Sequence, residues 1–350
     1  MAKFNPAWLP LAIGSVPHPD ADQAWSAILR YFPATPVWPQ LPRRSYLENM
    51  YVQYSERFPG AVLEEQRIYV DRHQDLDPAL ERLYLAYLED DVTYGAVSPD
   101  FSAGLAALQD GRVTLSQPLR LLKGQVTGPI SWGLTVVDQN RRPLLYDEVL
   151  ADAIAKHLRL KAAWQERLLA TYCPNTLIFI DEPYMSAFGS AFVSLEREQV
   201  IRYLREVLAG IKGLKGVHCC GNTDWSVLLE TPIDVLNLDA YEYASALALY
   251  PKEVAAFLDR GGIIAWGIVP AGEAAEGETA ERLVQRLEQS LEQLAAKGVS
   301  KEALLRSGLV TPSCGVGSLS EPLAERVFEL TVQVSTIMRA RYVAEEVQAP

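Results

Sequence analysis

The sequence has 350 residues and a formal net charge of −12, and 49% of its residues are apolar. A chain of this composition can bury a large core, and its negative charge argues against nucleic acid and anionic membrane surfaces as partners. No apolar run approaches the ~18 residues of a transmembrane helix, and the first residues lack the basic-then-apolar order of a signal peptide. Four cysteines do not form a disulfide framework in a chain this long, so we expect a cytoplasmic protein with free thiols.

Short apolar segments alternate with longer helical ones along the chain. We expect strands near residues 12, 37, 123, 178, 217, 236, 265 and 309. Most are followed by a helix, and the predicted helices cover about 20–31, 77–89, 147–170, 223–230, 252–259 and 278–297, with others beginning near 196 and 321. Strands that are short and apolar on both faces are typical of a parallel sheet buried between helices.

Eight such units favour closure into a (β/α)8 TIM-type barrel, with residues 1–350 forming a single catalytic domain. A doubly wound open sheet is the alternative, but no strand is followed by a G-x-G-x-x-G turn. Residues 43–118 are too long for one connection between a strand and a helix. We expect them to form an insertion over the barrel mouth.

Polar residues follow several of the predicted strands, at the edge where (β/α)8 barrels carry their chemistry. These residues are Gly14, Ser15 and His18 after the first strand, Asp181 and Glu182 after the fourth, His218 and Cys220 after the fifth, Asp239 and Glu242 after the sixth, and Cys314 after the eighth. The sequence therefore predicts a functional site at this rim.

His218 and Cys220 have metal-ligand spacing, because residues i and i+2 of an extended chain point the same way. Cys314 joins them from the eighth strand, and one histidine with two cysteines suits a catalytic zinc that keeps an exchangeable position. A single buried cysteine is usually a small core residue. A set of three possible ligands at strand ends, with glycine after each of the two cysteines, favours zinc instead. We expect Cys173 and Cys219 to be structural.

Two further features have both a functional and a plain structural interpretation. Asp181 and Glu182 place two carboxylates at the barrel mouth, although an acid at this position is also common as a helix cap. Gly14 and Ser15 can offer backbone N–H groups to a carboxylate, or form an ordinary turn.

Taken in order, six segments of this sequence resemble the C-terminal catalytic barrel of cobalamin-independent methionine synthase. They are Ile13-Gly14-Ser15, Thr127-Gly128-Pro129, Ile180-Asp181-Glu182-Pro183, His218-x-Cys220, Asp234-Val235-Leu236-Asn237-Leu238-Asp239 and Pro312-Ser313-Cys314-Gly315. The resemblance extends from about residue 10 to 340. It implies a zinc-dependent methyltransferase acting on a thiol, with homocysteine as acceptor and methionine as product. Metal coordination would deprotonate the thiol and keep it nucleophilic.

The resemblance also assigns substrate contacts. Asp181 would bind the amino group of homocysteine, and the turn at Gly14 and Ser15 would bind its carboxylate. The family has a second amine contact in a Gly-Glu-x-Glu-Arg segment that this sequence lacks. Tyr54-Ser55-Glu56-Arg57 lies in a comparable place, which makes Glu56 a weak candidate for that contact.

The fourth zinc ligand and the methyl donor stay open. The family uses a glutamate after the sixth strand, where this chain has the shorter Asp239, so the fourth ligand is Asp239, Glu242 or water. The sequence does not include the further N-terminal barrel with which full-length synthases bind a folate polyglutamate. The donor is therefore a methylated corrinoid protein or a simpler methylfolate.

Two other functions remain as alternatives. Pro36-Val37-Trp38 and Arg43-Arg44-Ser45-Tyr46 faintly resemble the arginine segment of uroporphyrinogen decarboxylase, whose arginines bind propionate groups. That enzyme needs no zinc, so it would leave the His-Cys-Cys set unexplained. A barrel that binds a thiol or assists methyl transfer without turnover is the second alternative.

Overall fold

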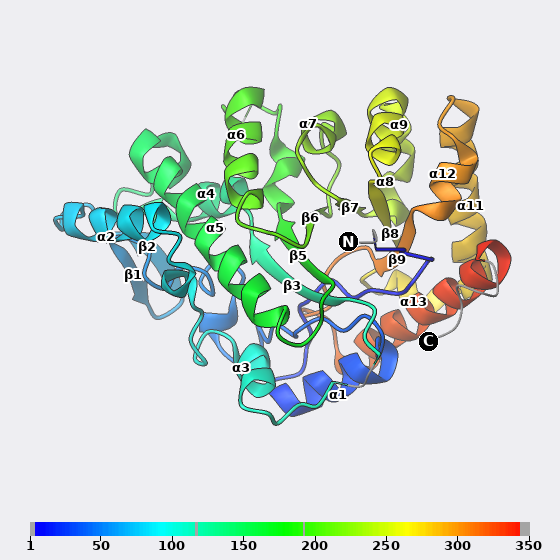
Figure 1. The fold of residues 1–350 in the computed structure, drawn as a ribbon, viewed down its shortest axis with the longest axis horizontal. Helices are drawn as coiled ribbons and strands as arrows, with labels where there is room; N and C mark the ends of the chain where they lie inside the picture. The colour runs from blue at the N-terminus through cyan, green and yellow to red at the C-terminus, as the bar shows by residue number, and fades with distance from the viewer. Residues whose placement is uncertain (1–3, 116–117, 192, 344–350) are drawn as a thin grey trace.

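The computed structural model describes residues 4–115, 118–191 and 193–343 (Figure 1). The ends of the expected domain, residues 1–3 and 344–350, lie outside the described residues. At the centre is a curled sheet of six parallel strands: β3 (Leu122–Thr127), β5 (Thr176–Asp181), β6 (Leu214–Cys219), β7 (Val235–Leu238), β8 (Ile263–Val269) and β9 (Gly308–Pro312). The strands are hydrogen-bonded in this order, and all six were expected from the sequence. Their parallel arrangement places their carboxyl ends at one rim.

The first two expected strands, near residues 12 and 37, do not form regular strands. These segments make isolated parallel bridges instead, which pair Pro10 with Val310, Ser15 with Gln40 and Val37 with Lys123. Prolines interrupt both segments at positions 10, 17, 33, 36, 39 and 42, and each removes a backbone donor from a possible ladder. The central sheet is thus a six-stranded half-barrel compatible with a TIM-like fold, and the described residues form no closed barrel of eight regular strands.

Apolar side chains fill the concave side of the curled sheet. The buried members of this cluster are Leu9, Leu11, Ile13, Leu121, Leu177, Phe179, Val235, Ile263, Ala265 and Leu309. Members of one segment are two residues apart, as in Leu177 and Phe179, because alternate residues of an extended chain face the same side. Leu9, Leu11 and Ile13 show that the N-terminal segment lies across the open side of the sheet.

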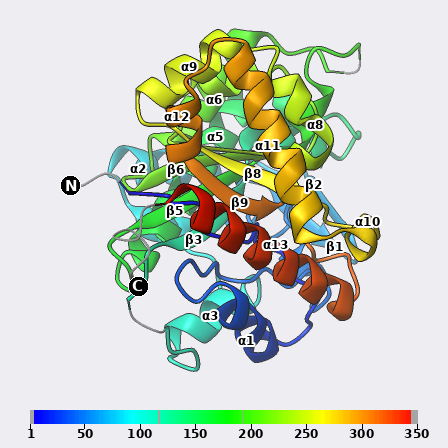
Figure 2. The same ribbon diagram turned by 90° about the vertical axis from the view of Figure 1, so that its right-hand side faces the viewer.

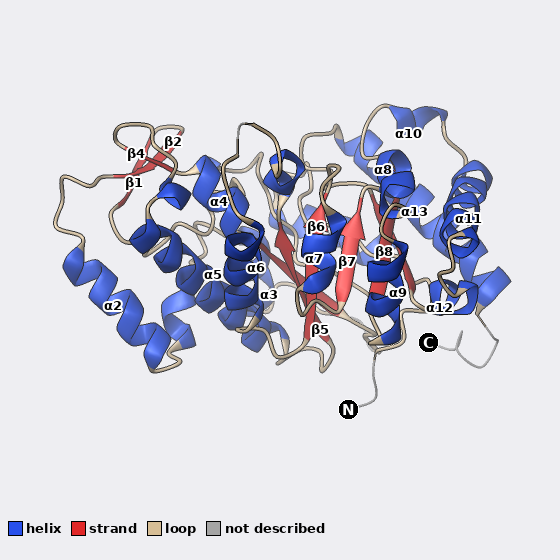
Figure 3. Ribbon diagram, turned by 90° about the horizontal axis from the view of Figure 1, so that it is seen from above, coloured by secondary structure: helices blue, strands red, loops and turns tan. Residues whose placement is uncertain are grey.

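Helices cover the outside of the sheet (Figure 3). They are α4 (Pro129–Thr135), α5 (Glu148–Leu169), α6 (Arg197–Leu208), α7 (Trp225–Glu230), α8 (Ala240–Leu247), α9 (Pro251–Asp259), α10 (Ala274–Gly277), α11 (Ala280–Ala296), α12 (Lys301–Arg306) and α13 (Glu321–Tyr342). Figure 2 shows α13 beside β9, with α11 packed against α13. No helix in the described ranges is long and apolar enough to cross a bilayer.

The first third of the chain adds elements at one end of the sheet. It contains α1 (Ala21–Tyr31), β1 (Ala61–Glu64), β2 (Arg67–Val70), α2 (Asp77–Leu88) and α3 (Ala103–Gln109). Asp20 caps α1, because its carboxylate accepts from two backbone N–H groups at the start of the helix. β1 and β2 form an antiparallel hairpin, to which β4 (Val137–Asp138) adds a third strand. α1 and α3 lie side by side (Figure 2).

Candidate metal and substrate site

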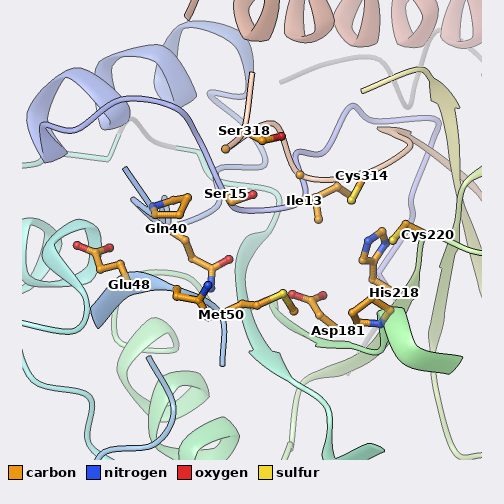
Figure 4. Close-up of a pocket in the computed structure, with 15 residues that line it drawn as sticks. Ile13, Ser15, Gln40, Glu48, Met50, Asp181, His218, Cys220, Cys314 and Ser318 are labelled. Atoms are coloured by element: carbon orange, nitrogen blue, oxygen red, sulfur yellow. The ribbon is translucent and has the colours of Figure 1, made fainter. Parts of the chain in front are cut away.

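A cavity of about 270 Å3 lies at the carboxyl ends of the strands. Its lining combines the ends of β5 and β6, the loop after β9 and the N-terminal segment (Figure 4). The residues with functional side chains are Ser15, Gln40, Glu48, Asp181, His218, Cys220 and Cys314. The volume is slightly below the roughly 300–1,000 Å3 of sites for drug-sized ligands, so the cavity suits a molecule of amino-acid size.

His218, Cys220 and Cys314 meet at one end of this cavity. One possible ligand atom from each lies within 4.8 Å of those of the other two. His218 belongs to β6 and Cys220 follows that strand by one residue, so the bend after β6 keeps both on the cavity side. Cys314 arrives from β9, and its loop is held by the Ser313 N–H, which donates to the Val269 carbonyl oxygen at 2.8 Å. In Figure 4 the three side chains gather on one side of the view.

The electrostatics of this cluster favour a thiolate. A hydrogen bond from Cys314, together with the adjacent His218, lowers the pKa of the Cys220 thiol to about 4 despite its burial. The same hydrogen bond, with burial, raises the pKa of Cys314. A low-pKa thiolate, a second thiol and an imidazole form a soft donor set that fits zinc. The three residues therefore have both the spacing and the chemistry of a metal site.

Asp181 lies beside this cluster at the end of β5. Its side chain is buried, with a residue exposure of 7%, and its Oδ1 atom has no hydrogen-bond partner. Burial raises its pKa to about 6, although His218 and Lys123 favour the charged form. A buried carboxylate oxygen without a partner is costly. Asp181 is thus available to a ligand donor, and Figure 4 shows it between Met50 and His218.

Glu182, the next residue, has a structural role. Its carboxylate accepts from the Ile130 N–H at 3.0 Å, the Ser131 N–H at 2.8 Å and the Ser131 hydroxyl at 2.6 Å. These bonds tie the start of α4 to the end of β5. The two adjacent acids therefore have different roles. Glu182 caps a helix, as one interpretation of the sequence predicted, while Asp181 faces the cavity.

The turn at Gly14 and Ser15 lies on the opposite wall. Gly14 has a φ of +152°, and a Cβ atom there would lie 2.7 Å from the Gln125 side-chain oxygen. The buried Lys123 ammonium donates to the Ile13 carbonyl oxygen and, at 3.2 Å, to the Gln125 side-chain oxygen. Lys123 and Gln125 of β3 thus pack against this turn. The Ser15 backbone N–H makes no hydrogen bond to another described residue.

Three other candidates from the sequence have different surroundings. Asp239 caps α8 by accepting from the Glu242 N–H at 2.9 Å, Glu242 itself is exposed, and neither belongs to the His-Cys-Cys group. Glu56 accepts from the Ser98 N–H at 2.9 Å and does not line the cavity. Asp239 and Glu56 thus each hold a local backbone N–H group. Burial raises the pKa of Asp239 to about 6 and Cys220 is among the groups that raise it further, so Asp239 lies within electrostatic reach of the cluster.

The arginines of the decarboxylase alternative also bind the protein itself. Arg43 donates to the Ser318 carbonyl oxygen at 2.9 Å, and Arg44 donates to Glu48 at 2.9 Å. Neither lines the cavity. Among the described residues, the cavity lining therefore lacks the arginine pair that recognition of propionate groups would need.

Three residues near the site were missed by the sequence analysis. Glu48 lines the cavity, but its oxygens accept from Leu41 and Arg44, and it lies far from His218 in Figure 4. Lys123 and Asn237 are fully buried within strands. A charged or amide side chain within a strand expected to be buried on both faces was the available signal for the last two.

Comparison with known proteins shows which solved structures share the fold of this chain. No family model matches the sequence, and no curated protein is similar to it in sequence. A methyltransferase from Methanosarcina mazei superposes with a TM-score of 0.54 at 10% identity, covering 98% of this chain and 96% of that one. A candidate vitamin-B12-independent methionine synthase from Listeria monocytogenes gives 0.56 at 12% identity, covering 93% and 86%.

A third similar structure is a B12-independent methionine synthase from a Shewanella species, in complex with selenomethionine. It gives a TM-score of 0.47 at 20% identity and covers 67% of this chain. The present chain spans 66% of that structure, just under two thirds of its length. The similarities to the Methanosarcina and Listeria structures, at 10% and 12% identity, show a shared fold.

Proposed function

We propose that this protein transfers a methyl group to a thiol, with a zinc ion held by His218, Cys220 and Cys314. Homocysteine is the proposed acceptor and methionine the product. The observation that carries the proposal is the meeting of three soft ligands within 4.8 Å at one end of a cavity that also contains a buried, unpartnered Asp181 oxygen. The shared fold with methyltransferases supports it.

Zinc bound there would supply the positive charge that keeps a substrate thiol deprotonated and nucleophilic at neutral pH. Three protein ligands are the usual complement of a catalytic zinc with one exchangeable position. Asp239 is engaged as a helix cap, so we propose that the exchangeable position takes the substrate sulfur rather than a fourth side chain.

The remaining cavity residues suit the amino-acid end of the substrate. The free Oδ1 of Asp181 accepts a hydrogen bond from the substrate ammonium group, which replaces the missing partner. The backbone N–H of Ser15 on the opposite wall donates to the substrate carboxylate. Holding both ends fixes the direction of the sulfur, and such positioning supplies much of the rate enhancement of a transfer between two bound reactants.

The proposal includes the scaffold and the donor. Residues 1–350 form a single (β/α)8 barrel in which the bridged segments near residues 12 and 37 complete the ring of strands. The donor is a methylated corrinoid protein or a methylfolate. In either case the bond between the methyl group and its donor breaks as the new sulfur–carbon bond forms, and the thiol proton is released.

The test is transfer of a labelled methyl group from each donor to homocysteine by the purified protein, with zinc content measured on the same sample. We expect about one zinc per chain and methionine formation that stops when a chelator removes the metal. Protein that is purified without chelators, contains no zinc and gains no activity when zinc is added would contradict the proposal.

A further inference from the structure

Asn237 is a fully buried amide in the middle of β7, between Leu236 and Leu238. An amide without partners costs free energy in an apolar strand, so its hydrogen bonds indicate why it is there. Its backbone pairs with His218 on β6 and with Ala265 on β8. Asn237 therefore lies directly beside one of the three candidate ligands.

The orientation of the Asn237 amide follows from its partners. Its Nδ2 group donates to the Ala265 carbonyl oxygen at 2.7 Å and to the Thr311 hydroxyl at 2.8 Å. A carbonyl oxygen can only accept, so the NH2 group must face Ala265. Both amide hydrogens are then used, and the Oδ1 atom faces His218.

This orientation determines which nitrogen of His218 carries the proton. The Oδ1 atom of Asn237 lies 2.5 Å from His218 Nδ1. Because Oδ1 is an acceptor, Nδ1 must be the donor, and the neutral ring then has its lone pair on Nε2. The Nε2 atom is the one left to face Cys220 and Cys314.

We propose that Asn237 is a positioning residue that fixes His218 in the Nδ1–H tautomer and presents Nε2 as a ligand. Thr311 takes part by accepting from the amide, so the network that holds the His218 ring reaches from β6 through β7 to β9. The tautomer is a property of the protein alone, whereas its use in binding zinc rests on the proposed function.

The first test measures the tautomer in the unmodified, metal-free protein. The chain has four histidines, so their ring nitrogens can be resolved by long-range proton–nitrogen NMR and assigned with His218→Gln. At a pH where the ring is neutral, we expect the proton of His218 on Nδ1. A proton on Nε2 would overturn the inference, and this measurement needs no folded Asn237 variant.

The second test measures zinc affinity by competition with a chelator. Asn237→Leu removes the acceptor and should weaken zinc binding about 10- to 100-fold, as found for residues that orient metal-bound histidines. Asn237→Asp keeps an acceptor for Nδ1–H and should restore most of that affinity. Wild-type affinity in Asn237→Leu, or an equal loss in both variants, would overturn the inference.

The two proposals fail in different ways. A wild type that binds no zinc would contradict the proposed function, while the NMR experiment would still decide the tautomer. A wild type that binds zinc through His218 with the proton on Nε2 of the metal-free ring would contradict the inference and leave the proposed function standing.

Discussion

The two walls of the cavity are built in different ways. The wall with Asp181, His218 and Cys220 lies at the ends of regular parallel strands, whose ladder fixes each backbone against its neighbours. The opposite wall comes mainly from residues 13–15 and 40–50, which contain isolated bridges, prolines and a short 3-10 turn. Two of the three candidate ligands, His218 and Cys220, thus lie on the more regular scaffold, and Cys314 follows the last strand of the same sheet. An irregular segment is suited to recognising the rest of the substrate.

The largest expected effect comes from removing one of the three candidate zinc ligands. Cys314→Ala leaves two of the three soft ligands, so zinc affinity should fall by more than about 100-fold, beyond the loss typical of residues behind a ligand. Metal content and chelator competition measure this. Cys219→Ala is the matched control, because Cys219 is a buried neighbour outside the His-Cys-Cys group. Equal zinc binding by Cys314→Ala and Cys219→Ala would exclude Cys314 as a ligand.

The contact between the end of β5 and the start of α4 should make the free energy of unfolding depend on pH. Burial raises the pKa of Glu182 to about 7 from 4.5, outweighing its three hydrogen bonds. The folded state then holds the proton more tightly than the unfolded state, so the free energy of unfolding falls as pH rises from about 4.5 to 7. The expected size is about 3 kcal/mol.

Glu182→Gln removes this titration, and urea unfolding of both proteins across this pH range measures the difference. The free energy of unfolding of the variant should change less with pH than that of the wild type. Identical pH slopes would show that Glu182 keeps its ordinary pKa in the folded protein.

The proposed binding of the substrate between the two walls is tested at Asp181. Asp181→Asn removes the charge that would bind the substrate ammonium group, a loss of about 1.5–3 kcal/mol for a charged hydrogen bond. Homocysteine affinity should therefore fall about 10- to 100-fold, with zinc content unchanged. Calorimetric titration of the zinc-loaded protein measures this, with the exposed Asp259→Asn as a control outside the cavity lining. Unchanged homocysteine affinity in Asp181→Asn would remove Asp181 from the substrate site.

The smallest expected effect is on the irregular wall. Gly14→Ala introduces a Cβ 2.7 Å from the Gln125 oxygen at a φ of +152°, so the free energy of unfolding should fall by about 1–2 kcal/mol. Thermal or urea unfolding measures the loss. At Gly272 an added Cβ would meet nothing within 4 Å, which makes Gly272→Ala the control. If both variants are equally stable, the turn is not constrained as the structure indicates.

The order of the regular elements was predictable from the sequence. The six central strands, β3 and β5 to β9, form around their predicted positions, because most are short apolar runs between helices. The helices at α4, α8 and α12 were missed, since they are short and their apolar pattern covers few turns. The strands expected near 12 and 37 reduce to bridges because proline removes ladder donors.

The sequence by itself determined which residues follow the strands, and hence that His218, Cys220, Cys314 and Asp181 lie at one rim. Parallel strands align their carboxyl ends, so the order of the strands is enough to place together positions that are far apart in the chain. The sequence did not determine which of two polar neighbours faces the cavity. Asp181 and Glu182 are adjacent acids, and only the packing of α4 shows that the Glu182 carboxylate is hydrogen-bonded while an oxygen of Asp181 has no partner. The Asn237 network was likewise decided by tertiary structure, because it joins four strands through side chains whose directions depend on their neighbours.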